Sequence, residues 1–134
     1  MNNNQPTCHV IAGPNGAGKT TLSGRSYAKL LKDLRYRGWK IVLFYLWIPS
    51  AEFSRLRVRQ RVTDGGHDIP ADSIARRYRR SVSNLLNVFI PLCDEVMCYD
   101  NSNPRPILTF EQRDGDRRIV DTFRFEEFLR SINE

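Results

Sequence analysis

The chain of 134 residues is poor in cysteine, histidine and lysine. Its three cysteines form no C-x-x-C pair, and the two histidines, His9 and His67, lie far apart, which argues against a structural zinc site. No apolar run approaches the ~20 residues that span a bilayer, and residues 1–6 lack the basic start and apolar stretch of a signal peptide. We therefore expect reduced thiols in a cytoplasmic protein without a membrane segment, folded as a single domain over residues 1–134.

Lysine is scarce, but arginine is not. The 21 basic residues include four lysines, which leaves 17 arginines, and the formal net charge is +6. Arginine presents a rigid fork suited to phosphate or carboxylate groups, which lysine does not. Composition alone leaves three interpretations open: contacts to nucleic acid, neutralisation of nucleotide phosphates, and solubility.

The most specific motif occupies residues 13–20, where Gly-Pro-Asn-Gly-Ala-Gly-Lys-Thr fits G-x-x-x-x-G-K-[ST] completely. Its glycines allow the backbone to wrap around a polyphosphate, with Lys19 reaching the terminal phosphates and Thr20 binding magnesium. The preceding residues 7–12 favour a strand, and residues 19–22 can begin a helix, so a chance match is the weaker interpretation. The predicted nucleotide-binding residues are Gly13, Pro14, Asn15, Gly16, Ala17, Gly18, Lys19, Thr20 and Thr21.

The remaining pattern predicts an α/β domain. The continuous apolar run 41–48 is typical of a strand buried on both faces of a parallel sheet. A hairpin is expected across residues 114–116, between strands at 107–111 and 118–120. The other predicted elements are a helix over 22–36, a strand over 94–99 and a closing helix over 123–132.

Residues 53–62 fit two structures. Arginines alternate with mostly apolar residues, as in a half-buried strand, but in a helix the same spacing places Arg57 one turn from Arg61. Ser50 is a suitable helix cap and Glu52 a suitable first-turn acid, so we expect a helix.

A second arginine group lies at residues 76–80, within a helix expected from Pro70 to about Phe89. The apolar stripe of that helix consists of Ile74, Tyr78, Val82, Leu85 and Phe89. Two interpretations of these arginines are open. They can form a solvated basic face, or they can belong to a lid, because Gly65 and Gly66 form a flexible break before the helix. Lids of phosphotransferases bring arginines to the transferred phosphoryl group.

Residues 11–21, 65–70, 74–81 and 99–102 together resemble the phosphate loop, lid and late strand of the zeta-toxin-like P-loop kinases, also labelled predicted ABC-type ATPases. The resemblance implies a P-loop kinase-like, mainly parallel sheet flanked by helices, with ATP or GTP and Mg²⁺. It also implies phosphoryl transfer to a small acceptor such as a UDP-amino sugar, and control by an antitoxin protein. In the resulting division, residues 13–20 are the P-loop, 61–81 the lid-like region, and 106–132 the C-terminal hairpin and helix. The residues expected to act in catalysis are Lys19, Arg61, Arg76, Arg77 and Arg80.

One family feature is missing. Members carry a further strand and an aspartate after the phosphate-loop helix, whereas here residues 19–24 join the two regions directly, as in an internal deletion. No acidic residue lies between Lys19 and Asp33. Asp100, at a strand end, is the remaining candidate for the acid, although a turn-forming role explains it better. A shortened sheet would also expose an edge, which makes a homodimer a candidate assembly.

Three functions remain open. The first is a zeta-toxin-type kinase, and the second an inert relative that binds nucleotide without transferring phosphate. The third, a nucleic-acid-binding module built on the arginines, is the weakest because no basic-aromatic motif accompanies them.

Overall fold

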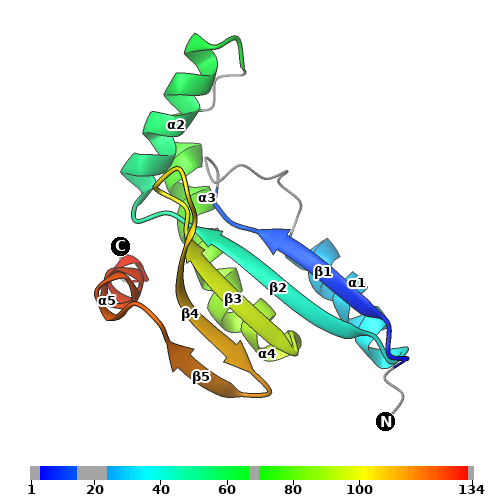
Figure 1. Ribbon diagram of the computed structural model, residues 1–134. Helices are drawn as coiled ribbons and strands as arrows, with labels where there is room; N and C mark the ends of the chain where they lie inside the picture. The colour runs from blue at the N-terminus through cyan, green and yellow to red at the C-terminus, as the bar shows by residue number, and fades with distance from the viewer. Residues whose placement is uncertain (1–3, 15–23, 67–69, 133–134) are drawn as a thin grey trace.

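One five-stranded sheet organises the molecule, whose computed structural model describes residues 4–14, 24–66 and 70–132 (Figure 1). The strands lie in the order β1 to β5. Strands β1, β2 and β3 are parallel, whereas β3, β4 and β5 pair antiparallel. The expected α/β class is confirmed, but the sheet is mixed rather than mainly parallel. The strands are β1 (Thr7–Ala12), β2 (Lys40–Trp47), β3 (Glu95–Asp100), β4 (Ile107–Arg113) and β5 (Asp116–Ile119).

The helices gather on one face of this sheet. In Figure 1, α1, α3 and α4 lie behind the strands, and α5 lies beside them next to β4. Among the described residues, no helix crosses the opposite face, which is called the open face below. The helical elements are α1 (Gly24–Tyr36), α2 (Ala51–Thr63), α3 (Ala71–Asn84), the π-helical segment η1 (Leu85–Phe89), α4 (Ile90–Leu92) and α5 (Thr122–Ser131).

The core lies between the sheet and these helices. Tyr45 and Trp47 of β2 are fully buried, and the ring of Trp47 meets Phe128 of α5 edge-on at 5.8 Å between centroids. Tyr78 of α3 is also fully buried, and its hydroxyl donates a 2.8 Å hydrogen bond to the Ile48 carbonyl at the end of β2. Burial of each such side chain contributes about 2 kcal/mol. Helix α3 is therefore held against the carboxyl end of β2, which α2 follows in the sequence.

The predicted apolar stripe of the long helix is confirmed, because all five of its residues are buried. The helix does not continue uniformly, however. Residues 85–89 form one π-helical turn between α3 and α4. The insertion of a wider turn changes the phase of the helix before Pro91 while keeping Leu85 and Phe89 in the core.

Local capping decides the ambiguous segment after β2 in favour of a helix. The Ser50 side chain accepts a hydrogen bond from the Phe53 N–H at 3.2 Å, and Glu52 lies in the first turn of α2. An N-cap oxygen satisfies a backbone donor that the helix itself leaves unpaired. The prediction of a helix over 53–62 is confirmed.

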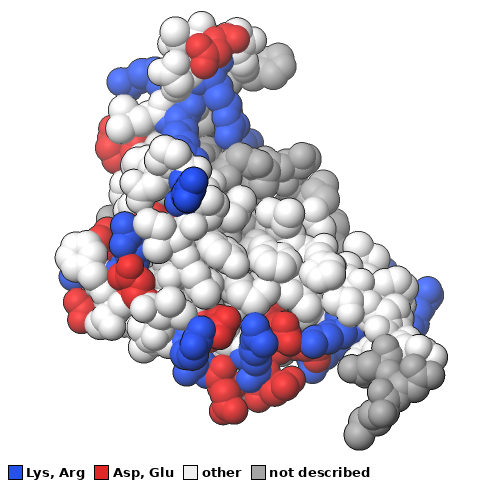
Figure 2. All heavy atoms as spheres, viewed as in Figure 1, with Lys and Arg blue, Asp and Glu red and all other residues white. Residues whose placement is uncertain are grey.

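Alternate side chains of β1, β2 and β3 point to the open face, where Phe44 is in register with Ile11 on one side and Met97 on the other. In Figure 2 the centre of this face is uncharged, and charged side chains follow its lower border. Two ion pairs join neighbouring strands: Lys40 of β2 with Glu95 of β3 at 2.9 Å, and Arg118 of β5 with Glu111 of β4 at 3.0 Å. The centre of the open face is thus uncharged, and charged side chains of both signs lie along its lower border (Figure 2).

Candidate nucleotide-binding site

The carboxyl ends of the three parallel strands meet at one end of the sheet, where Trp47 is in register with Asp100 and Ala12 with Tyr45. Ligands of open α/β sheets bind beyond this end. The G-x-x-x-x-G-K-[ST] motif begins here, because Gly13 and Pro14 directly follow β1 and are buried. The next described element is α1, from Gly24. The motif therefore follows a strand and precedes a helix in the sequence, whereas the predicted helix start at residues 19–22 lies outside the described residues.

The remaining predicted loop residues, 15–21, lie outside the described residues, and so do residues 67–69 of the predicted lid-like region. Lys19 and Thr20 are among them, so their assignment to phosphate and magnesium stays a prediction. Within the described part of the chain, no cluster of three or more His, Cys, Asp or Glu side chains is arranged to hold a metal ion. The magnesium assignment thus depends on the Thr20 hydroxyl and on the phosphates that a nucleotide would bring.

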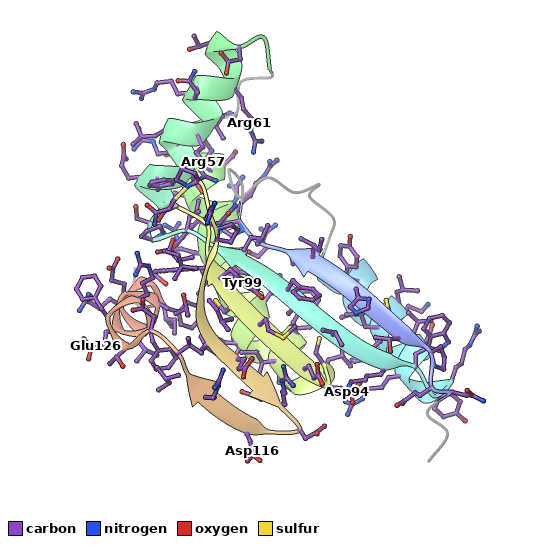
Figure 3. All side chains as sticks on the ribbon, in the orientation of Figure 1. Arg57, Arg61, Asp94, Tyr99, Asp116 and Glu126 are labelled. Atoms are coloured by element: carbon purple, nitrogen blue, oxygen red, sulfur yellow. The ribbon has the colours of Figure 1, made fainter. Side chains whose placement is uncertain are left out.

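Two arginines of α2 lie one turn apart; Arg57 contacts the turn after β3 at this end of the sheet, and Arg61 lies one turn further from it. Figure 3 shows Arg57 near the turn after β3 and Arg61 further along α2, on the side of the helix toward which β1 ends. The Arg57 guanidinium donates to the Asn101 carbonyl and stacks on the Phe53 ring at 5.0 Å. Partial burial lowers the pKa of Arg57, and the positive charge of Arg61 lowers it further. An anion placed here would relieve this repulsion.

Sequence reasoning named Arg61 but missed Arg57. The signal was present, since the two arginines are four residues apart in a segment expected to be helical. What the sequence did not reveal is that the Asn101 carbonyl, 44 positions further along the chain, anchors Arg57. Arg57 is thereby fixed at the strand ends, while Arg61 stays exposed.

The four arginines of α3 are exposed. They flank the buried Tyr78, so the core fixes the helix but leaves the guanidinium groups at the surface. Arg76 donates to Ser73 of its own helix at 3.3 Å. Helix α3 packs against α2. Arg76, Arg77 and Arg80 therefore lie on the helix that is the packing partner of the helix carrying Arg61.

Asp100, the candidate acid, is occupied by structural contacts. Its side chain is only 6% exposed, and one oxygen accepts from Arg124 Nε of α5 at 3.1 Å. The other oxygen accepts from the Ser102 N–H at 2.9 Å, which forms a turn after β3. The expected turn-forming role is confirmed, and both carboxylate oxygens already have partners.

The comparisons with known proteins are sparse. No protein-family model matches the chain, and no solved structure matches it. A segment of 60 residues is 35% identical to an uncharacterized protein of Haemophilus influenzae, and it covers 45% of this chain and 43% of that protein. The match thus spans less than half the length of that relative. The structure defines the chain as an α/β protein with a mixed sheet; within its described residues, no helix is long and apolar enough to cross a membrane.

Proposed function

We propose that this chain binds a nucleoside triphosphate, ATP or GTP, with Mg²⁺ in the loop of residues 13–20. The observation that carries the proposal is the position of the complete G-x-x-x-x-G-K-[ST] motif directly after a parallel strand and before a helix. Backbone N–H groups of the loop would hold the phosphates, Lys19 would neutralise the terminal ones, and the Thr20 hydroxyl would bind the metal ion. In this proposal the fold is a shortened member of the P-loop kinase-like class.

The α2 arginines support a triphosphate rather than an uncharged ligand. Arg57 and Arg61 place two like charges at the end of the sheet where the loop begins, and a phosphate would compensate them. Arg76, Arg77 and Arg80 are the further candidates for this role. Arginines beside a transferring phosphoryl group stabilise the charge that develops on it.

The motif resemblance supports a zeta-toxin type of protein, ancestrally a kinase for a small acceptor such as a UDP-amino sugar. A cytoplasmic location and an antitoxin protein as partner belong to the same proposal. The environment of Asp100 favours the alternative in which phosphate transfer is lost. Arg124 and the Ser102 N–H already occupy its carboxylate, so it is poorly suited to activate an acceptor hydroxyl.

Equilibrium titration with a fluorescent ATP analogue and Mg²⁺ tests the proposal. We expect affinity in the micromolar range, and loss of binding in Lys19→Ala, because the lysine supplies the charge nearest the terminal phosphates. Lys32→Ala is the matched control, since Lys32 is an exposed lysine of α1 outside the motif. Equal affinity of Lys19→Ala and the parent chain would refute the proposal.

Turnover separates the kinase from the inert relative. Radiolabelled ATP incubated with a UDP-amino sugar yields a phosphorylated product only if the chain still transfers phosphate to this acceptor. Lys19-dependent product formation would rule out the inert alternative, and its absence in a chain that binds ATP would support that alternative.

Nucleic-acid binding is a second candidate because of where the charge lies. Helices α2 and α3 hold eight arginines against two acids, Glu52 and Asp72, and therefore carry +6, the entire formal net charge of the chain. Binding of this kind predicts an affinity for single-stranded DNA or RNA that falls steeply with salt. A flat salt dependence would dispose of it.

A further inference from the structure

The two edges of the sheet differ in how they are protected. At one edge, β5 is four residues long, and three of them, Asp116, Arg117 and Arg118, are charged. At the other edge, β1 has six residues, Thr-Cys-His-Val-Ile-Ala, with no acidic, lysine or arginine side chain and no proline. Charges and short length discourage an edge strand from pairing with another chain. The β5 edge strand is both short and charged, whereas the β1 edge strand is longer and has no acidic, lysine or arginine side chain.

The backbone groups that β1 leaves unpaired can be identified from one hydrogen bond. The Lys40 N–H donates to the Pro6 carbonyl at 2.8 Å, so the even-numbered residues of this segment direct their backbone groups toward β2. Thr7, His9 and Ile11 consequently direct their N–H and C=O groups away from the sheet. Within the described ranges, no strand pairs with β1 on that side.

We propose that β1 pairs antiparallel with β1 of a second copy of this chain, about a twofold axis through His9. The axis is perpendicular to the sheet. The open face of one copy therefore continues into the open face of the other, and the helix-covered faces are joined in the same way. His9 then lies opposite its own copy, and Thr7 lies opposite Ile11 of the second copy. In this register the N–H and C=O groups of all three outward residues find partners, as an isologous interface requires.

Charge supports a second copy as the occupant. The molecule outside α2 and α3 has no formal net charge, because those helices carry the whole +6. They follow the carboxyl ends of the strands, and the antiparallel arrangement sends the two basic helical pairs to opposite ends of the joined sheet. The like charges of these two helical pairs therefore stay apart, and the strands that meet carry no acidic, lysine or arginine side chain of their own.

Side-chain exposure at the edge agrees with this pairing. Ile11 is 59% exposed, an unusual state for an isoleucine in a strand, and cross-strand contact with Thr7 of the second copy would cover part of it. Helix α1 lies behind β1 in Figure 1, so the same operation brings two α1 helices together on the covered face. That helix exposes Leu30 by 51%.

Sedimentation velocity of the full chain over a dilution series tests the assembly. We expect a species of twice 15.6 kDa in the parent chain and a species of 15.6 kDa in His9→Pro. Proline at position 9 removes an N–H that points away from β2, so the pairing of β1 with β2 is retained. Ile119→Pro is the matched control at the β5 edge, because Val120 donates to the Thr109 carbonyl and the neighbouring Ile119 N–H points outward. A monomeric parent chain, or a folded His9→Pro variant that stays dimeric, would overturn the proposal.

Cross-linking tests the register without a proline. Directly opposite, hydrogen-bonded residues have Cα atoms about 5.5 Å apart, within the range of a disulfide. In a Cys8→Ser background, His9→Cys should therefore give a covalent dimer on mild oxidation. Ile11→Cys in the same background should not, since the two copies of residue 11 would be roughly 13 Å apart along the strands. The reverse outcome, or no cross-link with either variant, would contradict a twofold axis at His9.

Discussion

At the scale of single residues, the acids and arginines at the strand ends divide into structural and exposed groups. Asp100 and Arg124 tie β3 to α5, and Arg124 also pairs with Asp121 at 2.8 Å. Arg57 is held by the Asn101 carbonyl, next to the same turn. Arg61 and the α3 arginines remain exposed. The buried contacts therefore stabilise the end of the sheet, whereas the exposed guanidinium groups lie at the surface.

Replacement of Asp100 tests its structural role. We expect Asp100→Asn to lower the free energy of unfolding by roughly 2 kcal/mol, because a charged hydrogen bond to Arg124 is lost in a nearly buried position. Asp33→Asn, at an exposed site on α1, is the control and should change stability by less than about 0.5 kcal/mol. Urea unfolding midpoints give both values, and equal midpoints for the two variants would contradict the assignment.

The helix cap of α5 predicts an acid-dependent stability. Hydrogen bonds from the Arg124 backbone N–H and guanidinium lower the pKa of Asp121 below its ordinary value of 3.8. A depressed pKa in the folded state stabilises the protein above pH 3.8, and this contribution disappears as the pH falls through the lower folded value. Thermal melts of the parent chain and Asp121→Asn should therefore converge in strong acid. A difference in melting temperature that stays constant from pH 6 down to pH 2 would argue against the mechanism.

At the scale of elements, turn and cap chemistry explains where the strands and helices begin and end. The β4–β5 hairpin closes through Asp114 at φ 51° and Gly115 at φ 87°, the pair of positive angles of a type I′ turn. Asp-Gly is a preferred sequence for this turn. The predicted hairpin across residues 114–116 is confirmed, and each strand is two residues longer toward the turn than expected.

The turn can be tested at its glycine. A Cβ at position 115 would meet no atom within 4 Å, so any loss in Gly115→Ala arises from backbone strain alone. We expect a loss of about 1 kcal/mol, the typical cost of the left-handed conformation for a residue with a Cβ. Asp114→Gly, which removes the same kind of strain at the neighbouring position, should be neutral or stabilising. A Gly115→Ala melting temperature equal to that of the parent would show that the turn tolerates a side chain.

Most elements could be predicted because their signals are local. The arginine-rich helix α2 follows from the Ser50 cap, and the stripe from Ile74 to Phe89 follows from helical spacing. The π-helical turn could not be predicted, since it depends on how Leu85 and Phe89 fit a core built by distant strands. The mixed sheet, the edge position of β1 and the Arg57–Asn101 contact are likewise products of tertiary packing, which no local pattern contains.

At the scale of the whole molecule, charge and apolar surface are separated. The basic helix α2 extends from the end of the sheet where the G-x-x-x-x-G-K-[ST] motif begins, the basic helix α3 runs from there behind the strands, and the remainder is neutral overall. The open face is turned away from the helices behind the sheet, and the uncharged edge strand β1 ends where the motif begins (Figure 1). One part of the molecule is thus suited to anions and another to a second copy of the chain. The two proposals can fail independently.

A crystal structure of the chain with Mg²⁺ and a non-hydrolysable ATP analogue tests the central claim most directly. The account predicts that residues 13–20 surround the phosphates, with Lys19 beside the terminal ones and Thr20 on the metal ion. It also predicts an arginine of α2 within hydrogen-bonding distance of a phosphate oxygen. A nucleotide bound elsewhere, or a loop that stays empty at saturating ligand, would contradict it.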